Sequence, residues 1–273
     1  MGFCNLIQIS DEVIKNIIQN YTMEPGVRKL KEILFDLYGH LNIELLKCVN
    51  INQELPIIIT NDDLEKKYLK KYKKIIDKKI HENDKVGIIN GLWANSFGKG
   101  GIIPIEVDFF PSTQFLELKL TGMQGDVMKE SMNVAKTVAW NLCSLDIRNK
   151  VLKECEQNKS SGIHIHCPEG AVSKDGPSAG VAITLAIYSI LNNVPIKNTI
   201  AITGEIDLQG NVLPIGGLDV KILGGIRAGI TTIIYPNKNH NEYLDFIEKH
   251  GEQSNIKFIE ISTIKEVLSH VFV

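Results

Sequence analysis

The surroundings of the serine at position 178 suggest chemistry. Ser178 lies in the segment 174–180, KDGPSAG, directly before the apolar stretch from Val181 to Leu191, and this pattern predicts a helix over 178–191. The first turn of a helix carries unpaired N–H groups and the positive end of the dipole, which stabilise an anion such as the oxyanion of acyl transfer. Serine is also a common helix N-cap. This segment alone supports both interpretations.

Residues 176–180, GPSAG, formally match the Gly-x-Ser-x-Gly pattern of hydrolase nucleophile elbows. In an elbow the serine follows its strand directly. Here a loop separates Ser178 from the strand predicted at 162–167, so the context of an elbow is missing. What remains is a serine at the start of a helix, and its hydroxyl needs a base to become a nucleophile.

Two kinds of base follow Ser178 in the chain. The downstream histidines are His240, His250 and His270, and all three have Asn-rich or Glu-rich neighbours typical of a surface. A histidine triad that uses one of them would be an α/β hydrolase. The other candidate base is a lysine, Lys221.

Lys221 falls within a predicted helix over 218–228. Its neighbours at helical spacing are small or apolar, namely Leu218, Gly224, Gly225 and Ala228. Such a face allows another backbone to approach closely, and loss of water lowers the pKa of a lysine. A fall from about 10.4 to about 7.5 would make it a usable general base near neutral pH. The alternative is a surface lysine whose stem covers apolar residues.

Two further patterns carry weaker signals. His164 and His166 alternate along a predicted strand, so they point to one face, but no third metal ligand is evident nearby and a structural pair is favoured. Gly98-Lys99 resembles the end of a P-loop, yet Trp93 stands where its first glycine would be. Gly100 also replaces the required Ser or Thr, so an ATP-binding P-loop is rejected.

The composition is that of an ordinary globular protein. The 273 residues are 44% hydrophobic and 23% charged, with a net charge of −2, which gives no bulk electrostatic case for a binder of nucleic acid or membrane surfaces. The five cysteines are scattered and odd in number, as expected in a reducing compartment. The apolar stretch 181–191 is too short to span a bilayer, and no targeting segment is visible at the N-terminus.

The first part of the chain predicts a helical module. Ser10 is a predicted N-cap for a helix that reaches Tyr21, and Pro25 suits the first position of a second helix. A short strand at 56–60 precedes a further helix that opens at 61. Residues 61–80 contain eight lysines against four acids, which favours a solvated face over a patch for an anionic partner.

From residue 85 onward strands and helices alternate, which places a domain boundary near residue 83. The fold class is therefore mixed α/β (α+β), a small N-terminal helical domain followed by a mixed-sheet domain with flanking helices. The predicted strands are 86–92, 102–107, 115–120, 162–167, 199–203, 212–215, 232–235 and 256–259. The predicted helices are 126–145, 178–191, 218–228, 242–250 and 264–270.

Taken together, these segments resemble the Lon protease family. Residues 168–171, PEGA, and 174–180, KDGPSAG, are similar to its serine signature. Residues 203–205, TGE, and 212–218, VLPIGGL, with Lys221, are similar to its lysine signature in the same order. The segments 91–92 and 125–131, GDVMKES, match further blocks of the family.

The resemblance extends to the N-terminal module. Residues 21–30, YTMEPGVRKL, are similar to the helical lid of the family's ATPase, with Arg28 at the nucleotide-sensing position. It implies a lid domain with its Lys-rich connecting helix over 1–83 and a proteolytic domain over 84–273. The Walker A and B motifs are missing, so the chain is expected to bind no cofactor, whereas the full-length enzyme would use ATP and Mg²⁺.

The resemblance also assigns roles in a Ser-Lys dyad. It implies that Ser178 is the nucleophile and Lys221 the general base. Thr203 would support the lysine by hydrogen bonding, and Asp175 would belong to the loop that opens or blocks the site. Glu106 matches an acidic residue close to the dyad.

Three positions depart from the family pattern. Ser173 replaces a usual proline in the serine loop, and 219–220, DV, stand where Lys-Glu is usual. Residues 93–95, WAN, rearrange the common Ala-Trp-Thr order. These changes affect the loop, the charge near the base and the local packing.

The resemblance implies a serine endopeptidase of an ATP-dependent machine that degrades unfolded or damaged proteins within a hexameric ring. Neither a membrane span nor nucleic-acid binding is indicated. The expected location is the mitochondrial matrix in a eukaryote, with a targeting segment absent from this chain, and otherwise the bacterial cytoplasm. Two alternatives are the α/β hydrolase with a downstream histidine and a noncatalytic assembly domain.

Overall fold

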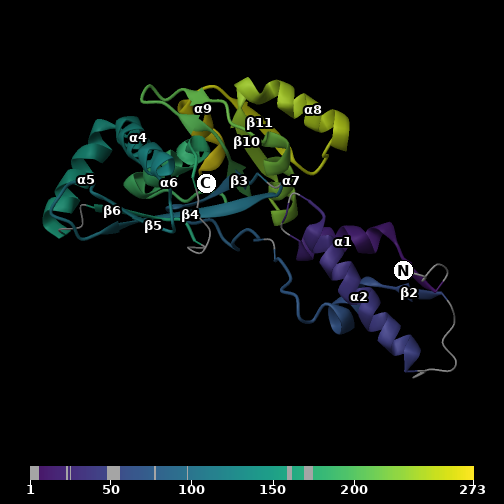
Figure 1. Ribbon diagram of the computed structural model, residues 1–273. Helices are drawn as coiled ribbons and strands as arrows, with labels where there is room; N and C mark the ends of the chain where they lie inside the picture. Colours follow the sequence, from purple (N-terminus) through teal and green to yellow (C-terminus); the bar gives the residue numbers. More distant parts are fainter. Residues whose placement is uncertain are drawn as a thin grey trace. The chain divides into compact units, whose positions relative to one another are not determined.

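The chain forms two compact units in a computed structural model (Figure 1). The first unit comprises residues 1–77 and 96–98, and the second comprises residues 78–95 and 99–273. The described residues are 6–22, 24, 26–47, 56–76, 78–96, 98–158, 162–168 and 175–273. Pro25, Ser173, Cys4 and Cys48 lie outside them.

The first unit contains the predicted helical module. Ser10 caps the first helix, since its Oγ accepts a hydrogen bond from Val13 N at 3.3 Å, as predicted. The second helix begins at Arg28. The predicted third helix is only one short turn, which continues as a π-helical turn over Leu64–Tyr68. The elements are β1 (Ile7–Ile9), α1 (Asp11–Tyr21), α2 (Arg28–Leu46), β2 (Ile57–Ile59) and α3 (Asn61–Asp63), with β1 parallel to β2.

The lysine-rich segment lies on the surface of this unit. Its lysines form ion pairs with acids of the same unit: Lys66 with Asp62 at 2.8 Å, Lys67 with Glu44 at 2.6 Å, Lys71 with Asp36 at 2.6 Å, and Lys74 with Glu65. Pairs as exposed as these contribute little to stability. Their partners are acidic residues of the same unit, which agrees with the interpretation of this segment as a solvated face.

The second unit is built on a seven-stranded mixed sheet in the order β11-β10-β7-β3-β4-β6-β5. The pairs β3/β4 and β4/β6 are antiparallel, and the other four pairs are parallel. A separate antiparallel pair joins β8 to β9. The strands are β3 (Ile88–Ala94), β4 (Gly100–Phe110), β5 (Leu118–Thr121), β6 (Gly162–His166), β7 (Ile200–Ile202), β8 (Glu205–Ile206), β9 (Val212–Leu213), β10 (Thr232–Pro236) and β11 (Lys257–Ile261).

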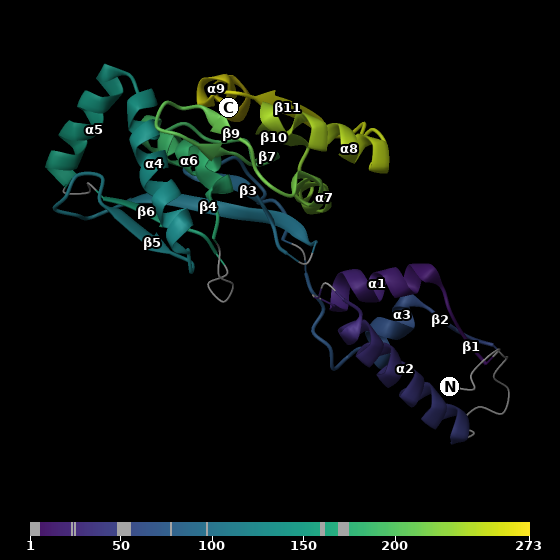
Figure 2. The same cartoon turned by 45° about the horizontal axis from the view of Figure 1, so that its top comes forward.

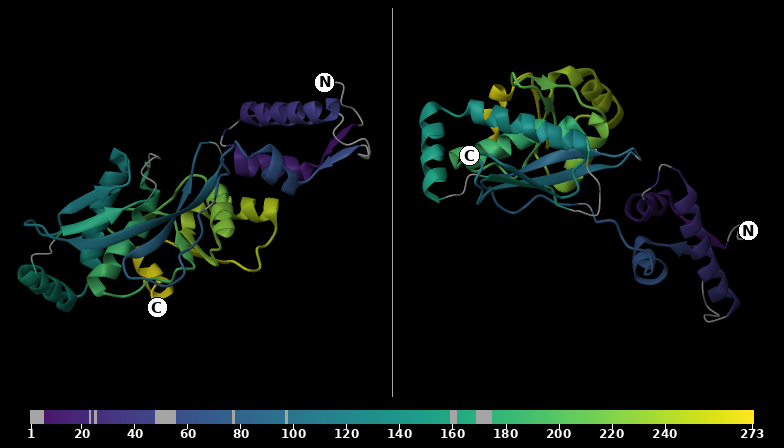
Figure 3. Two further views of the ribbon diagram at one scale, coloured as in Figure 1. Left: turned by 90° about the horizontal axis from the view of Figure 1, so that it is seen from below. Right: turned by 60° about the vertical axis from the view of Figure 1, so that its left-hand side comes forward.

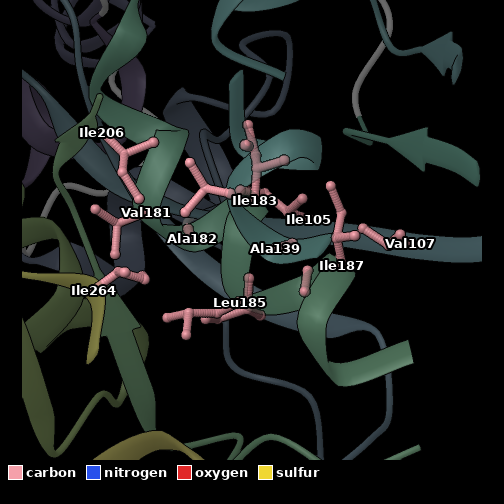
Figure 4. Packing of buried hydrophobic residues seen from close by; sticks show 14 of the residues in the cluster. Ile105, Val107, Ala139, Val181, Ala182, Ile183, Leu185, Ile187, Ile206 and Ile264 are labelled. Carbon is pink, nitrogen blue, oxygen red and sulfur yellow. The ribbon is translucent and has the colours of Figure 1, made fainter. Parts of the chain in front are cut away.

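Helices pack against both faces of this sheet, and Figures 2 and 3 show them from further directions. The unit has two hydrophobic cores, and alternate residues of β7 face each of them. Ile200 and Ile202 belong to the larger core, with residues of α4, α6 and α9, whereas Ala201 belongs to the smaller core, with residues of α7 and α8. Figure 4 shows α6 at the centre of the larger core. The helices are α4 (Asp126–Leu142), α5 (Leu145–Asn158), α6 (Gly180–Asn192), α7 (Leu218–Ala228), α8 (His240–His250) and α9 (Ile264–Val271).

The structure corrects two predicted elements in the first half of this unit. The helix expected over 126–145 ends at Leu142, because the backbone is extended at Cys143 and Ser144 Oγ then accepts from Ile147 N at 3.3 Å to start α5. Helix α5 was not predicted from the sequence; it is largely exposed and, among its described side chains, buries only Val151 and Cys155, with Ile147 partly buried at the same helical spacing. The strand expected over 115–120 begins only at Leu118, since Leu116 has a left-handed backbone with φ 54°.

Smaller boundary corrections affect the second half. The strand expected over 212–215 ends at Leu213, and the one expected over 256–259 extends to Ile261. The helix expected to open at Ser178 begins at Gly180, with a 3-10 turn over Pro177–Ala179 before it. The helix predicted over 218–228 has these same ends in the structure.

Candidate active site

Ser178 sits in the 3-10 turn directly before α6. Gly176 enters the turn with φ 128° and ψ 150°, a conformation that only glycine adopts readily. The N-cap of α6 is Ala179, and no side-chain capping bond exists at the turn or at the helix. The N-cap interpretation of Ser178 is therefore wrong, and the hydroxyl is not used to start the helix. We call residues 175–180 the serine turn.

The link between β7 and β8 holds the serine turn from one side. The carbonyl oxygen of Ser178 accepts hydrogen bonds from Gly204 N at 2.8 Å and from Thr203 Oγ1 at 3.3 Å. In return Val181 N donates to the carbonyl of Gly204 at 3.0 Å. The backbone at Ser178 and three residues after it is thereby attached to Thr203 and Gly204.

Lys221 lies on α7, and glycines bring this helix against strand β4. A Cβ at Gly224 would lie 2.3 Å from the backbone nitrogen of Gly101, and a Cβ at Gly100 would lie 2.3 Å from the carbonyl oxygen of Val220. Helix and strand therefore touch backbone to backbone, which only glycine permits. The small face noted in the sequence thus removes the space that water would occupy beside the lysine.

The ammonium group of Lys221 is consequently out of water. The residue is only 3% exposed, which contradicts the interpretation as a surface lysine. Burial lowers the pKa of Lys221 from 10.5 to about 8, while the charge of Glu242 acts in the opposite direction. Its Nζ donates to Thr203 Oγ1 at 3.2 Å. Thr203 therefore joins the lysine to the serine turn.

Ser178 and Lys221 line one cavity of about 400 Å³. Its walls combine a tryptophan, prolines and two carboxylates, and no histidine occurs among its described lining residues. Besides Ser178 and Lys221 these residues are Trp93, Ala94, Asp175, Pro177, Glu205, Pro214, Ile215 and Gly216. Because this cavity is partly open to solvent and Ser178 is only half-buried, it has room for a substrate carbonyl beside the serine and the lysine.

The other predicted site residues differ in whether they line this cavity. Asp175 lines the cavity, whereas Glu106 lies on β4 opposite His166 and is not among the described lining residues. Arg28 is exposed at the first position of α2. It belongs to the first unit.

The histidines found in the sequence have other partners. His240 Nδ1 pairs with Glu260 at 2.5 Å, and His250 ends α8. His164 and His166 both bond Thr121 Oγ1, at 2.9 and 2.7 Å. Across the described ranges no group of three metal-binding side chains is present. The two strand histidines therefore share one hydrogen-bond partner, the hydroxyl of Thr121 on β5.

Sequence reasoning missed Glu242 in the first turn of α8. Its Oε2 accepts from Leu218 N, the first residue of α7, at 3.4 Å, and its Oε1 accepts from Asn239 Nδ2 at 2.7 Å. Its charge also raises the pKa of Lys221. No local signal in the sequence could have found it, because α7 and α8 approach each other only in the tertiary fold.

A serine and a buried lysine on one cavity are the groups of a hydrolase that acts by nucleophilic attack with a lysine base. Residues 58–273 match the family described as Lon protease (S16) C-terminal proteolytic domain, and residues 5–37 match the Lon protease AAA+ ATPase lid domain. The chain belongs to the Lon protease family.

Bacterial Lon proteases are similar to nearly the whole chain. The Lon protease of Fervidobacterium nodosum is 37% identical over 265 residues, which are 96% of this chain and 30% of that protein. That of Metamycoplasma arthritidis is 37% identical over 268 residues, 97% of this chain and 30% of that protein. That of Campylobacter jejuni is 38% identical over 278 residues, 98% and 33% respectively. The chain thus spans about a third of the length of these relatives.

Proposed function

We propose that this chain is the proteolytic part of an ATP-dependent serine endopeptidase, with Ser178 as nucleophile and Lys221 as general base. The observation that carries the proposal is that Lys221 is buried, with a lowered pKa, beside the same cavity as Ser178. Its pKa of about 8 leaves a useful fraction of neutral amine near physiological pH, and Lys221 shares a cavity with Ser178. Family membership supports the same assignment.

In the proposed reaction the neutral Nζ of Lys221 takes the proton from Ser178 Oγ. The oxygen attacks the peptide carbonyl, and the tetrahedral intermediate collapses when the lysine returns the proton to the departing amine. A water molecule then gives a proton to Lys221 as it attacks the acyl-enzyme. The second tetrahedral intermediate collapses, Lys221 returns this proton to the departing Ser178 Oγ, and the carboxylic acid is released.

Two neighbours assist these steps. Thr203 Oγ1 accepts one N–H of Lys221 and so orients Nζ within the cavity. The positive end of α6, at the serine turn, favours the oxyanion that develops on the carbonyl. Both contributions depend on the backbone of Ser178, which leads into α6 and is hydrogen-bonded to Thr203.

The larger assembly is part of the same proposal. The first unit acts as the lid, within the proposed domains 1–83 and 84–273, and the full-length enzyme binds ATP and Mg²⁺. Arg28 fits a contact with nucleotide phosphate, because its exposed guanidinium has no ion pair with another described residue. Unfolded or damaged proteins would be degraded inside a hexameric ring, in the cytoplasm of a bacterium like those of the relatives. No helix in the described ranges is long and apolar enough to cross a membrane.

The experiment is hydrolysis of a flexible fluorogenic peptide between about pH 6 and pH 10, with Ser178→Ala and Lys221→Ala beside the parent chain. We expect both variants to lose at least about a thousandfold in kcat/KM. The parent rate should rise with pH through an apparent pKa of about 8, because only the neutral amine accepts the proton.

The matched control is the triple variant His240→Ala, His250→Ala, His270→Ala. It should retain activity, because none of these histidines lines the cavity. If the triple variant is inactive while Lys221→Ala is active, the histidine hydrolase replaces this proposal. A parent chain that is folded but neither cleaves peptide nor reacts with a fluorophosphonate probe would instead indicate a noncatalytic assembly domain.

A further inference from the structure

Helix α4 starts without a capping side chain of its own. Its N-cap is Gly125, which has no side chain to satisfy the first backbone N–H groups. The missing acceptor comes from the serine turn, because Asp175 Oδ1 accepts from Met128 N at 3.0 Å. Met128 is the third residue of the helix, and its N–H is one that an N-cap side chain ordinarily satisfies. Asp175 thus completes α4 from a distant part of the chain.

The glycine at 125 makes room for this carboxylate. A Cβ built there would lie 2.3 Å from Asp175 Cγ, 2.6 Å from Oδ2 and 2.7 Å from Oδ1. The backbone of Gly125, with φ −73° and ψ 175°, is one that any residue adopts. Conformational freedom therefore does not require glycine at this position, whereas the approach of Asp175 does.

Asp175 is also tied to the residues that present Ser178. The same Oδ1 accepts from Gly176 N at 3.0 Å, which links the carboxylate to the glycine that enters the turn. One helical turn further along α4, Ser131 Oγ donates to the carbonyl of Pro177 at 3.4 Å. The first turns of α4 thus hold residues 175–177, whereas Thr203 and Gly204 hold the backbone from Ser178 onward.

We propose that Asp175 is a positioning residue for Ser178, whose carboxylate caps α4 across the fold and thereby holds the serine turn in place. This inference rests on the proposed function of Ser178. The nucleophile must stand within a fraction of an ångström of its productive position, and an error of about 1 Å costs about a hundredfold in rate. One hydrogen-bonded carboxylate therefore links the start of a remote helix to catalysis.

A second role for Asp175 would be electrostatic, because it shares the cavity with Lys221. The pKa of Lys221 is set by burial and by Glu242, and Asp175 is not among its causes. Loss of Asp175 should therefore lower the rate at every pH and leave the apparent pKa near 8. An electrostatic role would instead move the apparent pKa downward when the negative charge is removed.

The test uses four variants of the chain: Asp175→Ala, Asp175→Asn, Gly125→Ser, and Asp175→Ala combined with Gly125→Ser. The serine introduced at 125 gives α4 a local cap and, in the Asp175→Ala background, meets no carboxylate. The readouts are kcat and KM for peptide hydrolysis across pH, unfolding by urea, and hydrogen exchange of the segments 126–131 and 175–181.

We expect kcat to fall about 10- to 100-fold in Asp175→Ala with KM nearly unchanged, and by less in Asp175→Asn, which keeps an acceptor. Adding Gly125→Ser should restore stability and slow exchange in 126–131, but leave kcat low and exchange in 175–181 fast. Gly125→Ser alone should also lower kcat, because it displaces Asp175. These results would support positioning.

Recovery of kcat together with stability in the double variant would overturn the proposal, since capping alone would then explain Asp175. Full activity of Asp175→Ala would overturn it too. If the parent chain is inactive, the proposed function fails, and hydrogen exchange still decides the link: faster exchange in both segments on loss of Asp175 would support it, and unchanged exchange would refute it.

Discussion

The two halves of the candidate dyad are held by different forces. Directional hydrogen bonds hold the serine turn: Asp175 accepts from the start of α4, and the Ser178 carbonyl accepts from Thr203 and Gly204. Packing holds Lys221, through glycines that let α7 lie directly on β4. The position of Ser178 therefore depends on a few polar atoms, whereas the pKa of Lys221 depends on how completely water is excluded.

The two halves share one device, and its consequences differ. Both α4 and α7 follow a glycine that offers no cap, and each receives a carboxylate from another element, Asp175 for α4 and Glu242 for α7. Of these two carboxylates, only Glu242 contributes to the pKa of Lys221. A carboxylate at a helix start can thus serve geometry in one place and electrostatics in the other.

The largest effect is expected where packing is broken. Gly224→Ala would place a Cβ 2.3 Å from the backbone nitrogen of Gly101 and push α7 away from β4. We expect a loss of about 3 kcal/mol in the free energy of unfolding and a base that water reaches. Urea unfolding and the pH dependence of hydrolysis would measure both effects.

Gly225→Ala is the matched control on the same helix. The nearest atoms to a Cβ there are two side-chain ends that can shift slightly, Leu92 Cδ2 at 3.2 Å and Ile233 Cδ1 at 3.3 Å, and Ile230 Cβ follows at the ordinary contact distance of 3.8 Å. Alanine also favours the helix by about 1 kcal/mol, so the net change should be small. Equal losses in the two variants would mean that backbone contact does not set the fit of α7.

The next effect concerns the cost of burying Lys221. Its pKa is about 8 in the folded chain and 10.5 as the reference value, so below pH 8 the folded state carries an unfavourable buried charge. Lys221→Met should raise the free energy of unfolding by about 3 kcal/mol at pH 7. As pH rises from 8 to 10.5 the unfolded state loses its proton too, and this advantage should disappear.

Urea unfolding at several pH values measures this difference. Lys265→Met, at an exposed position of α9, is the control and should change stability by less than about 0.5 kcal/mol at any pH. A destabilised Lys221→Met variant at pH 7 would show that the lysine is not buried as a costly charge.

A smaller effect is expected at Thr203, where the two halves meet. Thr203→Val removes the acceptor of the Lys221 Nζ hydrogen bond and the donor to the Ser178 carbonyl. We expect kcat/KM to fall about 10-fold, equivalent to about 1 to 2 kcal/mol. Thr203→Ser keeps the hydroxyl and should lose much less, and equal rates in both variants would exclude the hydroxyl from catalysis.

The smallest effect is expected at Glu242. Glu242→Gln keeps an oxygen for Leu218 N but removes the charge that raises the pKa of Lys221. The apparent pKa of hydrolysis should therefore fall below 8, by less than about one pH unit. Asp175→Asn is the comparison and should leave that pKa unchanged. An upward shift in Glu242→Gln would contradict the electrostatic assignment.

Local patterns were sufficient for the elements that depend on local contacts. The small and apolar neighbours of Lys221 predicted α7 with its observed ends, and the cap at Ser10 predicted α1. Patterns failed where the backbone departs from a regular element. The extended Cys143 ends the helix predicted over 126–145 three residues early, and the left-handed Leu116 shortens a strand.

The site shows the same division. The residues around Ser178 and Lys221 made them candidates, with a helix N-cap and a surface lysine as the alternatives, and the resemblance added Thr203. The partners of Asp175 and Glu242 were not found, because the N-termini of α4 and α7 that they cap lie far away along the chain. No local spacing in the sequence identifies a carboxylate whose hydrogen-bond partner lies in a distant segment of the chain.

The sequence by itself determined which groups could react and which helix could bury a lysine, because side-chain type and helical spacing are local properties. Only the tertiary structure decided how dry Lys221 is, and which carboxylates complete the two helices. Desolvation depends on every atom that surrounds a charge, and here those atoms come from α7, β4 and Thr203, which meet only when the sheet is assembled.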